Sequence, residues 1–327
     1  MKLPLHFLLL STLLCLSSSE LCHPEDKKVL LDIKKAFNDP YVLSSWDPKA
    51  DCCHWLCVEC DLITHRIITL IIMTDNKISG PIPPQVGDLP FLQTLVFHKL
   101  PNITGPIQPT IAKLNSLTFL RLSWTNISGS VPDFISQLKN LTILDLSFNN
   151  LTGSIPSSLS SLPNLGALHL DRNKLTGTIP KSFGKFQGNV PYLYLSHNQL
   201  SGKIPASLSK TDFSLIDLSR NKLEGDPWML FGTNKTTSQI DLSRSTLEFD
   251  LSKVEVPKTI EYLDLNHNRI SGGIPVALAA MNNLQFLNVS YNRLCGQIPV
   301  GGKLQRFDYS SYFHNRCLCG APLPSCK

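Results

Sequence analysis

Long apolar runs are scarce in this sequence: one lies at the start of the chain and no second one follows. Lys2 precedes the run Leu8–Leu16, and the small residues Ser17 and Ser19 come after it. This order is typical of a secretory signal peptide, and it predicts a signal over residues 1–19. The run is far shorter than the ~20 apolar residues of a membrane-spanning helix. We therefore expect a soluble, secreted chain that contacts no membrane.

A strong excess of either charge is also missing. Lys and Arg total 30 and Asp and Glu total 25, so the formal net charge is +5, and removing Lys2 with the signal leaves +4. This small excess is compatible with residence beside an acidic polymer but gives no reason to expect nucleic acid as a partner.

Motifs of catalysis are absent as well. The sequence contains no glycine-rich phosphate loop, no serine-nucleophile motif and no regular spacing of metal ligands. Paired carboxylates occur, but glycoside hydrolysis needs one carboxylic acid in a distinct, protected environment. The aspartates of this chain recur at equivalent positions of a repeat. We expect no enzyme activity, no cofactor and no metal site.

Cysteine is missing from the whole middle of the chain, between Cys60 and Cys295. Cys15 belongs to the predicted signal, and the other cysteines form two terminal groups that a secreted protein is expected to use in disulfides. A zinc site at Cys57 and Cys60 is the alternative, but no second pair with zinc-finger spacing accompanies them. The expected pairs are Cys22–Cys52, Cys53–Cys60, Cys295–Cys317 and Cys319–Cys326. Cys57 is then an odd thiol, either buried and inert or competing with Cys60.

The dominant feature that is present is a repeat of about 24 residues from His65 to Pro299. Its clearest copies are LDLSFNNLTGSIP (Leu144–Pro156), LHLDRNKLTGTIP (Leu168–Pro180) and LYLSHNQLSGKIP (Leu193–Pro205). A period in this range predicts a solenoid, in which each unit buries its apolar face against its neighbours. The terminal units lack a neighbour, so caps are needed. We expect a cap over 20–64, ten repeats over 65–299 and a second cap over 300–327.

Each repeat predicts one short strand with two buried anchors, and successive strands are expected to stack as a parallel sheet. The ten segments are Leu70-x-Ile72, Leu95-x-Phe97, Leu120-x-Leu122, Leu144-x-Leu146, Leu168-x-Leu170, Leu193-x-Leu195, Ile216-x-Leu218, Ile240-x-Leu242, Leu263-x-Leu265 and Leu287-x-Val289.

An asparagine three residues after the second anchor is expected to bond backbone groups of neighbouring turns. It recurs at Asn149, Asn173, Asn198, Asn221, Asn268 and Asn292, and is replaced by Thr125 and Ser245. A glycine turn follows in every repeat except the eighth, where Leu247-Glu248-Phe249-Asp250 predicts an irregularity.

The N-terminal cap is expected to contain an amphipathic helix over 24–38. Val29, Leu30, Ile33 and Phe37 recur at helical spacing, and Trp46 and Trp55 are expected to fill the same cap.

The outward positions of the strands carry two conspicuous sets of charged residues. The acidic column contains Asp145, Asp171, Asp217, Asp241 and Asp264, and the basic column contains Arg172, His197, Arg220 and Arg244. Aromatic residues lie among them at Phe119, Trp124, Phe148, Tyr192, Tyr194 and Tyr262. Exposed aromatics on a concave surface suit binding anchors. The alternative is that adjacent Asp and Arg residues pair and merely solvate the sheet.

Six Asn-x-Ser/Thr sequons behind a signal peptide predict a glycoprotein. They begin at Asn102, Asn126, Asn140, Asn150, Asn234 and Asn288.

These residues together resemble the polygalacturonase-inhibiting proteins, a family of plant extracellular leucine-rich-repeat proteins. The strand and its Leu-x-Gly-x-Ile-Pro continuation carry the resemblance, as do Asp51-Cys52-Cys53, the segment Gly302–Asp308 and the segment Cys317–Cys326. The resemblance covers nearly the whole chain and implies a curved α/β solenoid, a right-handed superhelix with a concave parallel sheet. Cys57 is an extra thiol relative to members with eight cysteines.

The resemblance implies a monomeric plant defence protein of the cell wall and apoplast. Its implied partners are endopolygalacturonases, of fungi first and insects second, whose active-site cleft it would cover with its acidic concave face. Matching positions point to Asp145, Asp171, Asp217, Trp124 and Tyr192. Asp241, Phe148, His169 and Tyr194 complete the expected enzyme-binding surface, and Asp with a reference pKa of ~3.9 is expected to stay ionised in an acidic wall. Pectin is a second implied partner, with His197, Arg220 and Arg244 as its candidate site.

Two other functions use the same architecture. A carrot antifreeze protein is similar to this family, but ice binding favours a flat, regular array of short polar residues, which the mixed columns do not provide. A soluble co-receptor for a peptide or sterol is the other alternative, and the short chain without an island domain argues against it.

Overall fold

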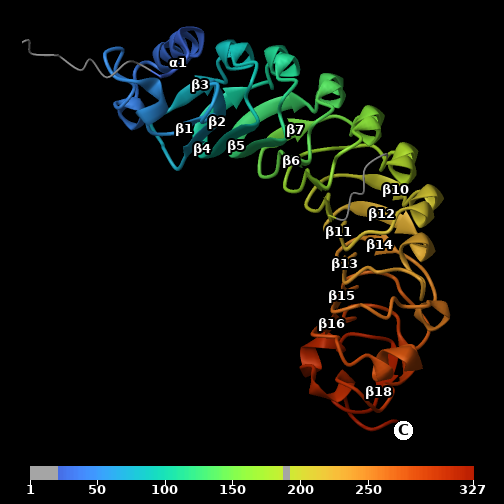
Figure 1. Cartoon of the computed structure of the whole chain (residues 1–327). Coiled ribbons are helices and arrows are strands. Elements are labelled where there is room, and N and C mark those ends of the chain that lie inside the picture. The colour runs from blue at the N-terminus through green and yellow to red at the C-terminus, as the bar shows by residue number, and fades with distance from the viewer. Residues whose placement is uncertain (1–20, 187–191) are drawn as a thin grey trace, which may run out of the picture.

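The computed structural model describes residues 21–186 and 192–327, so the predicted signal over 1–19 lies outside the described residues. The chain forms one continuous arc, with the N-terminal helix α1 (Pro24–Ala36) at one end and β18 (Cys317–Cys319) at the other (Figure 1). Strands line the inner side of the arc and short helices line the outer side. The expected curved leucine-rich-repeat solenoid is confirmed.

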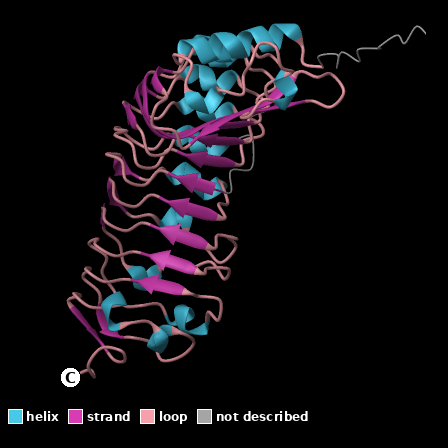
Figure 2. Cartoon of the chain, turned by 90° about the vertical axis from the view of Figure 1, so that its left-hand side faces the viewer, coloured by secondary structure: helices cyan, strands magenta, loops and turns pink. Residues whose placement is uncertain are grey.

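The concave sheet contains all ten predicted strands, in chain order and parallel (Figure 2). The first anchors are aligned from strand to strand, as in Leu144 with Leu168 and Leu168 with Leu193. The strands are β2 (Ile67–Met73), β4 (Thr94–Gly105), β5 (Phe119–Ser130), β6 (Ile143–Asp145), β8 (Ala167–His169), β9 (Tyr192–Tyr194), β11 (Leu215–Asp217), β13 (Gln239–Asp241), β15 (Tyr262–Asp264) and β16 (Phe286–Asn288). An additional strand, β1 (Val58–Cys60), pairs antiparallel with β2 and was not predicted.

A second, discontinuous set of strands follows each turn and was also not predicted. β4 and β5 are long because they run from the concave sheet into this second layer, where they meet β3 and β7. The other members are short. They are β3 (Ser79–Pro81), β7 (Asn150–Thr152), β10 (Ser201–Lys203), β12 (Lys222–Gly225), β14 (Thr246–Leu247), β17 (Cys295–Gln297) and β18.

The outer side of the arc consists of 3₁₀ helices, and in most repeats a proline caps the first turn, as Pro156, Pro180 and Pro205 do. Neighbouring helices approach closely: a Cβ on Gly184 would lie 2.2 Å from the carbonyl oxygen of Ser207, so only glycine fits there. The helices are η3 (Pro84–Asp88), η4 (Pro109–Lys113), η5 (Asp133–Gln137), η6 (Ser157–Ser161), η7 (Lys181–Lys185), η8 (Ala206–Lys210), η9 (Trp228–Leu230), η10 (Leu251–Lys253) and η11 (Val276–Ala280).

The asparagine ladder is present at all six predicted positions. The amide of Asn198 donates from Nδ2 to the carbonyl oxygens of Leu170 (2.9 Å), Leu195 (3.1 Å) and Ser196 (3.2 Å), and its Oδ1 accepts from the Leu175 amide (2.9 Å). One buried side chain thus joins two consecutive repeats. The ladder continues into the C-terminal cap, where Asn315 donates to the Val289 carbonyl and accepts from the Leu294 amide.

The residue before each ladder position adopts the left-handed conformation without being glycine. From Thr74 to His314 these residues have φ between 52° and 56° in every repeat. This conformation is unfavourable by about 1 kcal/mol for a residue with a Cβ. It reverses the chain so that the next side chain, the asparagine, points inward, and the hydrogen bonds of that amide offset the strain.

The eighth repeat is irregular, as predicted. Among the described residues, no residue in the range 245–266 has a positive φ. Each of the other repeats has a glycine with positive φ in the turn that follows its strand. Phe249 is buried instead, and the second-layer strand β14 shrinks to Thr246–Leu247. The Ser245 hydroxyl reaches only the Asn221 carbonyl, at 3.5 Å.

The N-terminal cap covers the first repeat with α1 and two tryptophans. Leu30, Ile33 and Phe37 are buried, and Trp46 and Trp55 stack with ring centroids 5.6 Å apart. The helix ends at Ala36 rather than at residue 38. Asp26, expected only to suit the helix dipole, is buried and bonded to the Arg66 guanidinium at 2.7 and 2.9 Å, which fastens the helix to the sheet.

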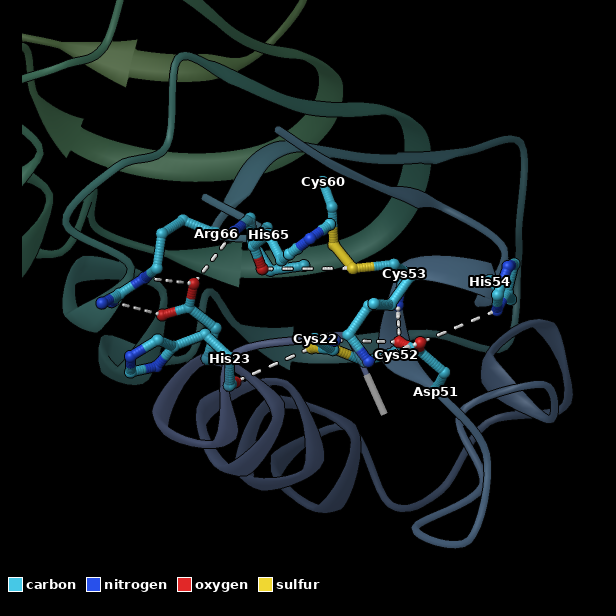
Figure 3. The surroundings of a disulfide bond; sticks show 12 residues. Cys22, His23, Asp51, Cys52, Cys53, His54, Cys60, His65 and Arg66 are labelled. Carbon is cyan, nitrogen blue, oxygen red and sulfur yellow. Dashed lines mark hydrogen bonds and ion pairs between the residues drawn. A yellow bond between two sulfur atoms is a disulfide. The ribbon is translucent and has the colours of Figure 1, made fainter. Parts of the chain in front are cut away.

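All four predicted disulfides are present, two in each cap. Figure 3 shows the N-terminal pair, where Asp51 accepts hydrogen bonds from the backbone amides of Cys22 and Cys53. Cys57 is unpaired and half-buried. This burial raises the pKa of its thiol. The sulfurs of Cys22, Cys53 and Cys60 lie within 4.8 Å of one another, but all three are in disulfides and are not available as metal ligands. Among the described residues, none of the helices has the length and apolarity needed to cross a membrane.

The ladder makes a stability prediction in two directions. Asn198→Ala should lower the free energy of unfolding by about 2–3 kcal/mol, because it leaves buried backbone groups unpaired. Ser245→Asn should raise it by about 1 kcal/mol, because an amide at this level can reach carbonyl groups that the serine does not. Urea denaturation followed by circular dichroism measures both. Equal effects of Asn198→Ala and of Gln199→Ala, the exposed neighbour, would contradict the assignment.

Candidate concave binding surface

The acidic column lies on the concave sheet, and the sheet holds most of its members by a recurrent local bond. Oδ1 of Asp145 accepts from the backbone amide and hydroxyl of Ser147 at 3.0 and 2.6 Å, and Asp217 binds Ser219 in the same way. Asp241 and Asp264 accept from the amides of the residues two positions on. The recurring Asp-Leu-Ser sequence is the signal for this bond, which was not predicted. These aspartates therefore also stabilise the strand ends.

Asp145 differs from the other acidic residues because it is paired. Its Oδ2 accepts from Arg121 Nε at 2.8 Å, and the residue is only 6% exposed. Mutual pairing of Asp and Arg, the alternative interpretation of the columns, thus holds at this position. Asp145 stabilises the surface, and little of its carboxylate is accessible to a partner.

The remaining acidic residues are not uniformly ionised. Burial, together with the nearby carboxylates of Asp145 and Asp217, raises the pKa of Asp171 to about 7. Burial and the carboxylates of Asp217 and Asp264 likewise raise the pKa of Asp241 to about 7. The expectation that all of these aspartates stay ionised in an acidic wall is therefore wrong: half-buried carboxylates on adjacent strands retain protons.

The basic column occupies the left-handed positions at the ends of the strands. Arg172, Arg220 and Arg244 are exposed, and no ion pair holds them within residues 21–186 and 192–327. Together with His197 they form one side of a shallow hollow of about 470 Å³, with Asp171, Asp217, Asp241 and Asp264 on the other. Burial and the cations of Arg172 and Arg220 lower the pKa of His197, so it is neutral except in acid.

The predicted aromatic residues lie mainly in stacked pairs. Trp124 stacks on Phe148 with ring centroids 3.8 Å apart, and the Arg172 guanidinium lies 4.8 Å from the centroid of Phe148 on its other side. His169 stacks on Tyr194 at 4.3 Å. Trp124 and Tyr192 remain 47% and 45% exposed. The surface therefore presents rigid aromatic anchors at its N-terminal half and centre, next to the acidic column.

The sequon asparagines occupy several parts of the arc. Asn102 and Asn126 lie in the second halves of β4 and β5, Asn150 begins β7, and Asn150 Nδ2 donates to Asn126 Oδ1 at 3.0 Å. Asn140 and Asn234 are exposed outside the strands. Asn288 differs, since it lies in β16 on the concave sheet, where its Oδ1 accepts from the amide and hydroxyl of Ser290. Glycosylation at all six stays a prediction.

The fold and the concave surface together define a protein of the leucine-rich-repeat class. The chain matches the family model for the leucine-rich-repeat N-terminal domain over residues 23–61 and leucine-rich-repeat models over 115–175, 189–211, 259–281 and 283–302. It is 72% identical to a polygalacturonase inhibitor of Pyrus communis, over 98% of this chain and 96% of the relative. A polygalacturonase inhibitor of Vitis vinifera is 68% identical over 98% and 95% of the two chains. The chain belongs to the polygalacturonase inhibitor family.

One solved structure that is similar along nearly the whole arc belongs to a protein described by a different function. A crystal structure described as a plant ice-binding protein superposes with a TM-score of 0.92 at 53% identity, covering 94% of this chain and 98% of its own. Four relatives of 65–72% identity are named as polygalacturonase inhibitors rather than as enzymes. The expectations of family and of a non-enzymatic protein are confirmed.

The raised pKa values predict a pH-dependent stability change. Asp171→Asn and Asp241→Asn should each raise the free energy of unfolding by on the order of 1–3 kcal/mol at about pH 8 and have little effect at about pH 4. A carboxyl whose folded pKa of about 7 exceeds its unfolded value contributes stability fully below the unfolded pKa, and that contribution is lost as the pH rises through about 7. Asparagine has no proton to lose.

Urea denaturation at three pH values measures this effect, with Asp32→Asn on the exposed face of α1 as the control. An equal gain at low and high pH would show that the carboxyls are not protonated when folded.

Proposed function

We propose that this chain is a secreted plant defence protein that binds and inhibits endopolygalacturonases with its concave face. The observation that carries the proposal is 72% identity over nearly the full length to a protein named a polygalacturonase inhibitor. We place it in the cell wall, acting as a monomer against enzymes of fungi, with insect enzymes as a second target.

Charge complementarity supports the concave face as the contact surface. An enzyme that holds polygalacturonate, an acidic polymer, needs a basic cleft. The acidic column offers opposite charge along a curved sheet, and Trp124 and Tyr192 offer exposed aromatic anchors beside it. Complementary charge accelerates encounter and fixes orientation, and rigid aromatic groups supply contact area.

Protonation gives this surface a pH response. Asp171 and Asp241, with pKa values of about 7, carry protons in an acidic wall. A basic cleft placed against them favours the ionised form, so docking releases protons and the affinity rises with pH toward 7. Asp217 lies between these two residues in the same hollow, and two hydrogen bonds from Ser219 hold its carboxylate in place for a partner.

Substitutions at the centre of the surface test the contact. Asp217→Asn and Tyr192→Ala should each weaken binding of an inhibited fungal endopolygalacturonase by about tenfold or more. Asp171→Asn should flatten the rise of affinity with pH. Isothermal titration calorimetry against a panel of purified enzymes, with inhibition measured in parallel, reports both. Asp145→Lys is a poor test because it breaks the Arg121 pair and destabilises the sheet.

Matched variants away from the concave face serve as controls. Trp228→Ala and Glu224→Gln change exposed residues of η9 and β12 on the other side of the arc, so binding should be unchanged. Loss of binding in these controls, with none in Asp217→Asn or Tyr192→Ala, would overturn the concave assignment.

We propose pectin as a second partner, bound along the basic column. Arg220 and Arg244 are exposed and project into the same hollow as the acidic column. Cations spaced one strand apart suit a polymer with a carboxylate on each sugar unit. His197 is largely neutral because its pKa is lowered, so it adds charge only in acid.

Retention on immobilised pectate tests this site. Arg220→Gln with Arg244→Gln should elute at clearly lower salt than the wild-type chain, because two of the column's cations are lost. Lys253→Gln, on the outer helix η10, removes one charge away from the column and serves as the control, which should elute close to the wild-type chain. Unaltered retention of the double variant would remove the basic column as the pectin site.

Ice binding is the second candidate, supported by the similar ice-binding structure. The concave columns of acids, arginines and aromatics do not form a flat array of short polar groups. An ice-recrystallisation assay beside the inhibition assay separates the two functions.

A further inference from the structure

A second hollow lies at the N-terminal end of the arc, apart from the one between the charged columns. It has a volume of about 470 Å³, within the range of small-ligand sites. Its lining comes from the first three repeats: Thr74, Asp75, Asn76, Lys99, Pro101 and Trp124. No polar side chain of the acidic or basic column lines it.

The hollow lies where the turns of the first two repeats are one residue longer than those of the later repeats. Gly80 and Gly105 each follow the left-handed residue of their repeat by six positions, whereas Gly129, Gly153 and Gly177 follow theirs by five. The additional residue produces a register shift between β4 and β5, from Leu100 to Thr104. Both lengthened turns also lack the ladder asparagine, which Asp75 and Leu100 replace. Packing accounts for Leu100, which is fully buried, but not for Asp75 or the additional residue.

Trp124 forms one wall of this hollow. Phe148, from the following repeat, covers one face of the indole with centroids 3.8 Å apart. The residues that line the hollow come from the preceding repeats, and in the part of the chain that the structure describes no ring or cation is recorded against the other face. The stack of planar groups from Arg172 through Phe148 to Trp124 therefore ends at an open surface, because Lys99 and Thr74 continue the column without a ring.

The other walls carry hydrogen-bonding groups on a rigid backbone. Oδ1 of Asp75 accepts from the amides of Lys77 and Ile78 at 2.6 and 2.8 Å, which fixes the carboxylate and leaves Oδ2 free. Thr74 and Lys99 are held at φ of 56° and 55°. Three polar side-chain groups have no hydrogen-bond partner among the described residues: the Thr74 hydroxyl, the Asn76 side-chain amide and the Lys99 ammonium.

We propose that this hollow binds a neutral hexopyranose ring, stacked on the open face of Trp124. The apolar face of a pyranose suits an indole platform, and its hydroxyls can donate to Asp75 Oδ2 and accept from Lys99 and Asn76. Asp75 and Lys99 carry opposite charges, so their sum favours neither an anionic nor a cationic sugar. The site differs in place and in ligand charge from the pectin site proposed on the basic column.

Two sources could supply the ring. The sequon residue Asn102 donates from Nδ2 to the Asn76 carbonyl at 2.6 Å, and Asn126 Nδ2 donates to the Pro101 carbonyl at 2.6 Å. A glycan on either would start at the rim of the hollow. A sugar of another molecule would enter from solvent.

Titration of the full-length mature protein with neutral methyl hexopyranosides tests the proposal, followed by saturation-transfer NMR and tryptophan fluorescence. The wild-type chain should bind with millimolar affinity, and Trp124→Ala should bind at least about tenfold more weakly. Trp228→Ala, which removes another exposed tryptophan, should bind normally. Asp75→Asn, which keeps an acceptor for the turn, should shift preference toward galacturonate because a repelling charge is removed.

The variant with Asn102→Gln and Asn126→Gln identifies the source. Equal binding by this variant and the wild type indicates an external sugar. Binding by the variant alone indicates that the chain's own glycan fills the hollow, again on Trp124. If no hexopyranoside binds to either protein, or if Trp124→Ala added to the protein that does bind leaves its affinity unchanged, the proposal fails. No polygalacturonase is present in the assay, so this result is independent of the proposed inhibition.

Discussion

The arrangement of every functional group on this protein depends on one buried hydrogen-bonded unit, the ladder asparagine with the left-handed residue before it. The amide joins two successive repeats, and it reaches them only because the preceding residue reverses the chain at φ near 53°. The hydrogen bonds of the asparagine offset the strain of that residue. The same reversal places the side chain of the left-handed residue at the rim of the concave sheet, in every repeat.

This constraint explains why the columns are straight and rigid. A side chain on the left-handed residue has no structural duty of its own, so Trp124, Phe148 and Arg172 can stack along the rim without disturbing the core. The acidic column is less free. The Asp-Leu-Ser bond makes Asp145 and Asp217 part of the strand ends, and a substitution there changes both binding and stability. Variants on this surface need an unfolding measurement beside each affinity.

The periodicity of the sequence sufficed to predict the anchors, the ladder and the irregular eighth repeat, and the grouping of the cysteines at the two ends predicted the four disulfides. Each of these is enforced by burial or covalent geometry, which leaves a residue pattern. The second strand layer was missed because its members, such as Ser201–Lys203, are short and polar and are formed by stacking rather than by propensity. The protonation of Asp171 and Asp241 was also missed, since it arises from carboxylates brought within range on adjacent strands. The burial of Asp145 depends on Arg121, one repeat away, and no local pattern encodes that pair.

Departures from the repeat then become the best guide to function on such a scaffold. In a regular repeat, the stacking of neighbouring repeats fixes the residue type at each position. A position that departs from this pattern without improving the packing therefore needs another explanation. The eighth repeat breaks the rule and gains a buried Phe249, which is a structural explanation. The first two repeats break it by one residue each, and they gain a hollow beside a half-exposed tryptophan and free polar groups. Leu100 of the second repeat is buried in the core, but the hollow itself contributes nothing to the core, so a ligand is the more economical explanation for its shape.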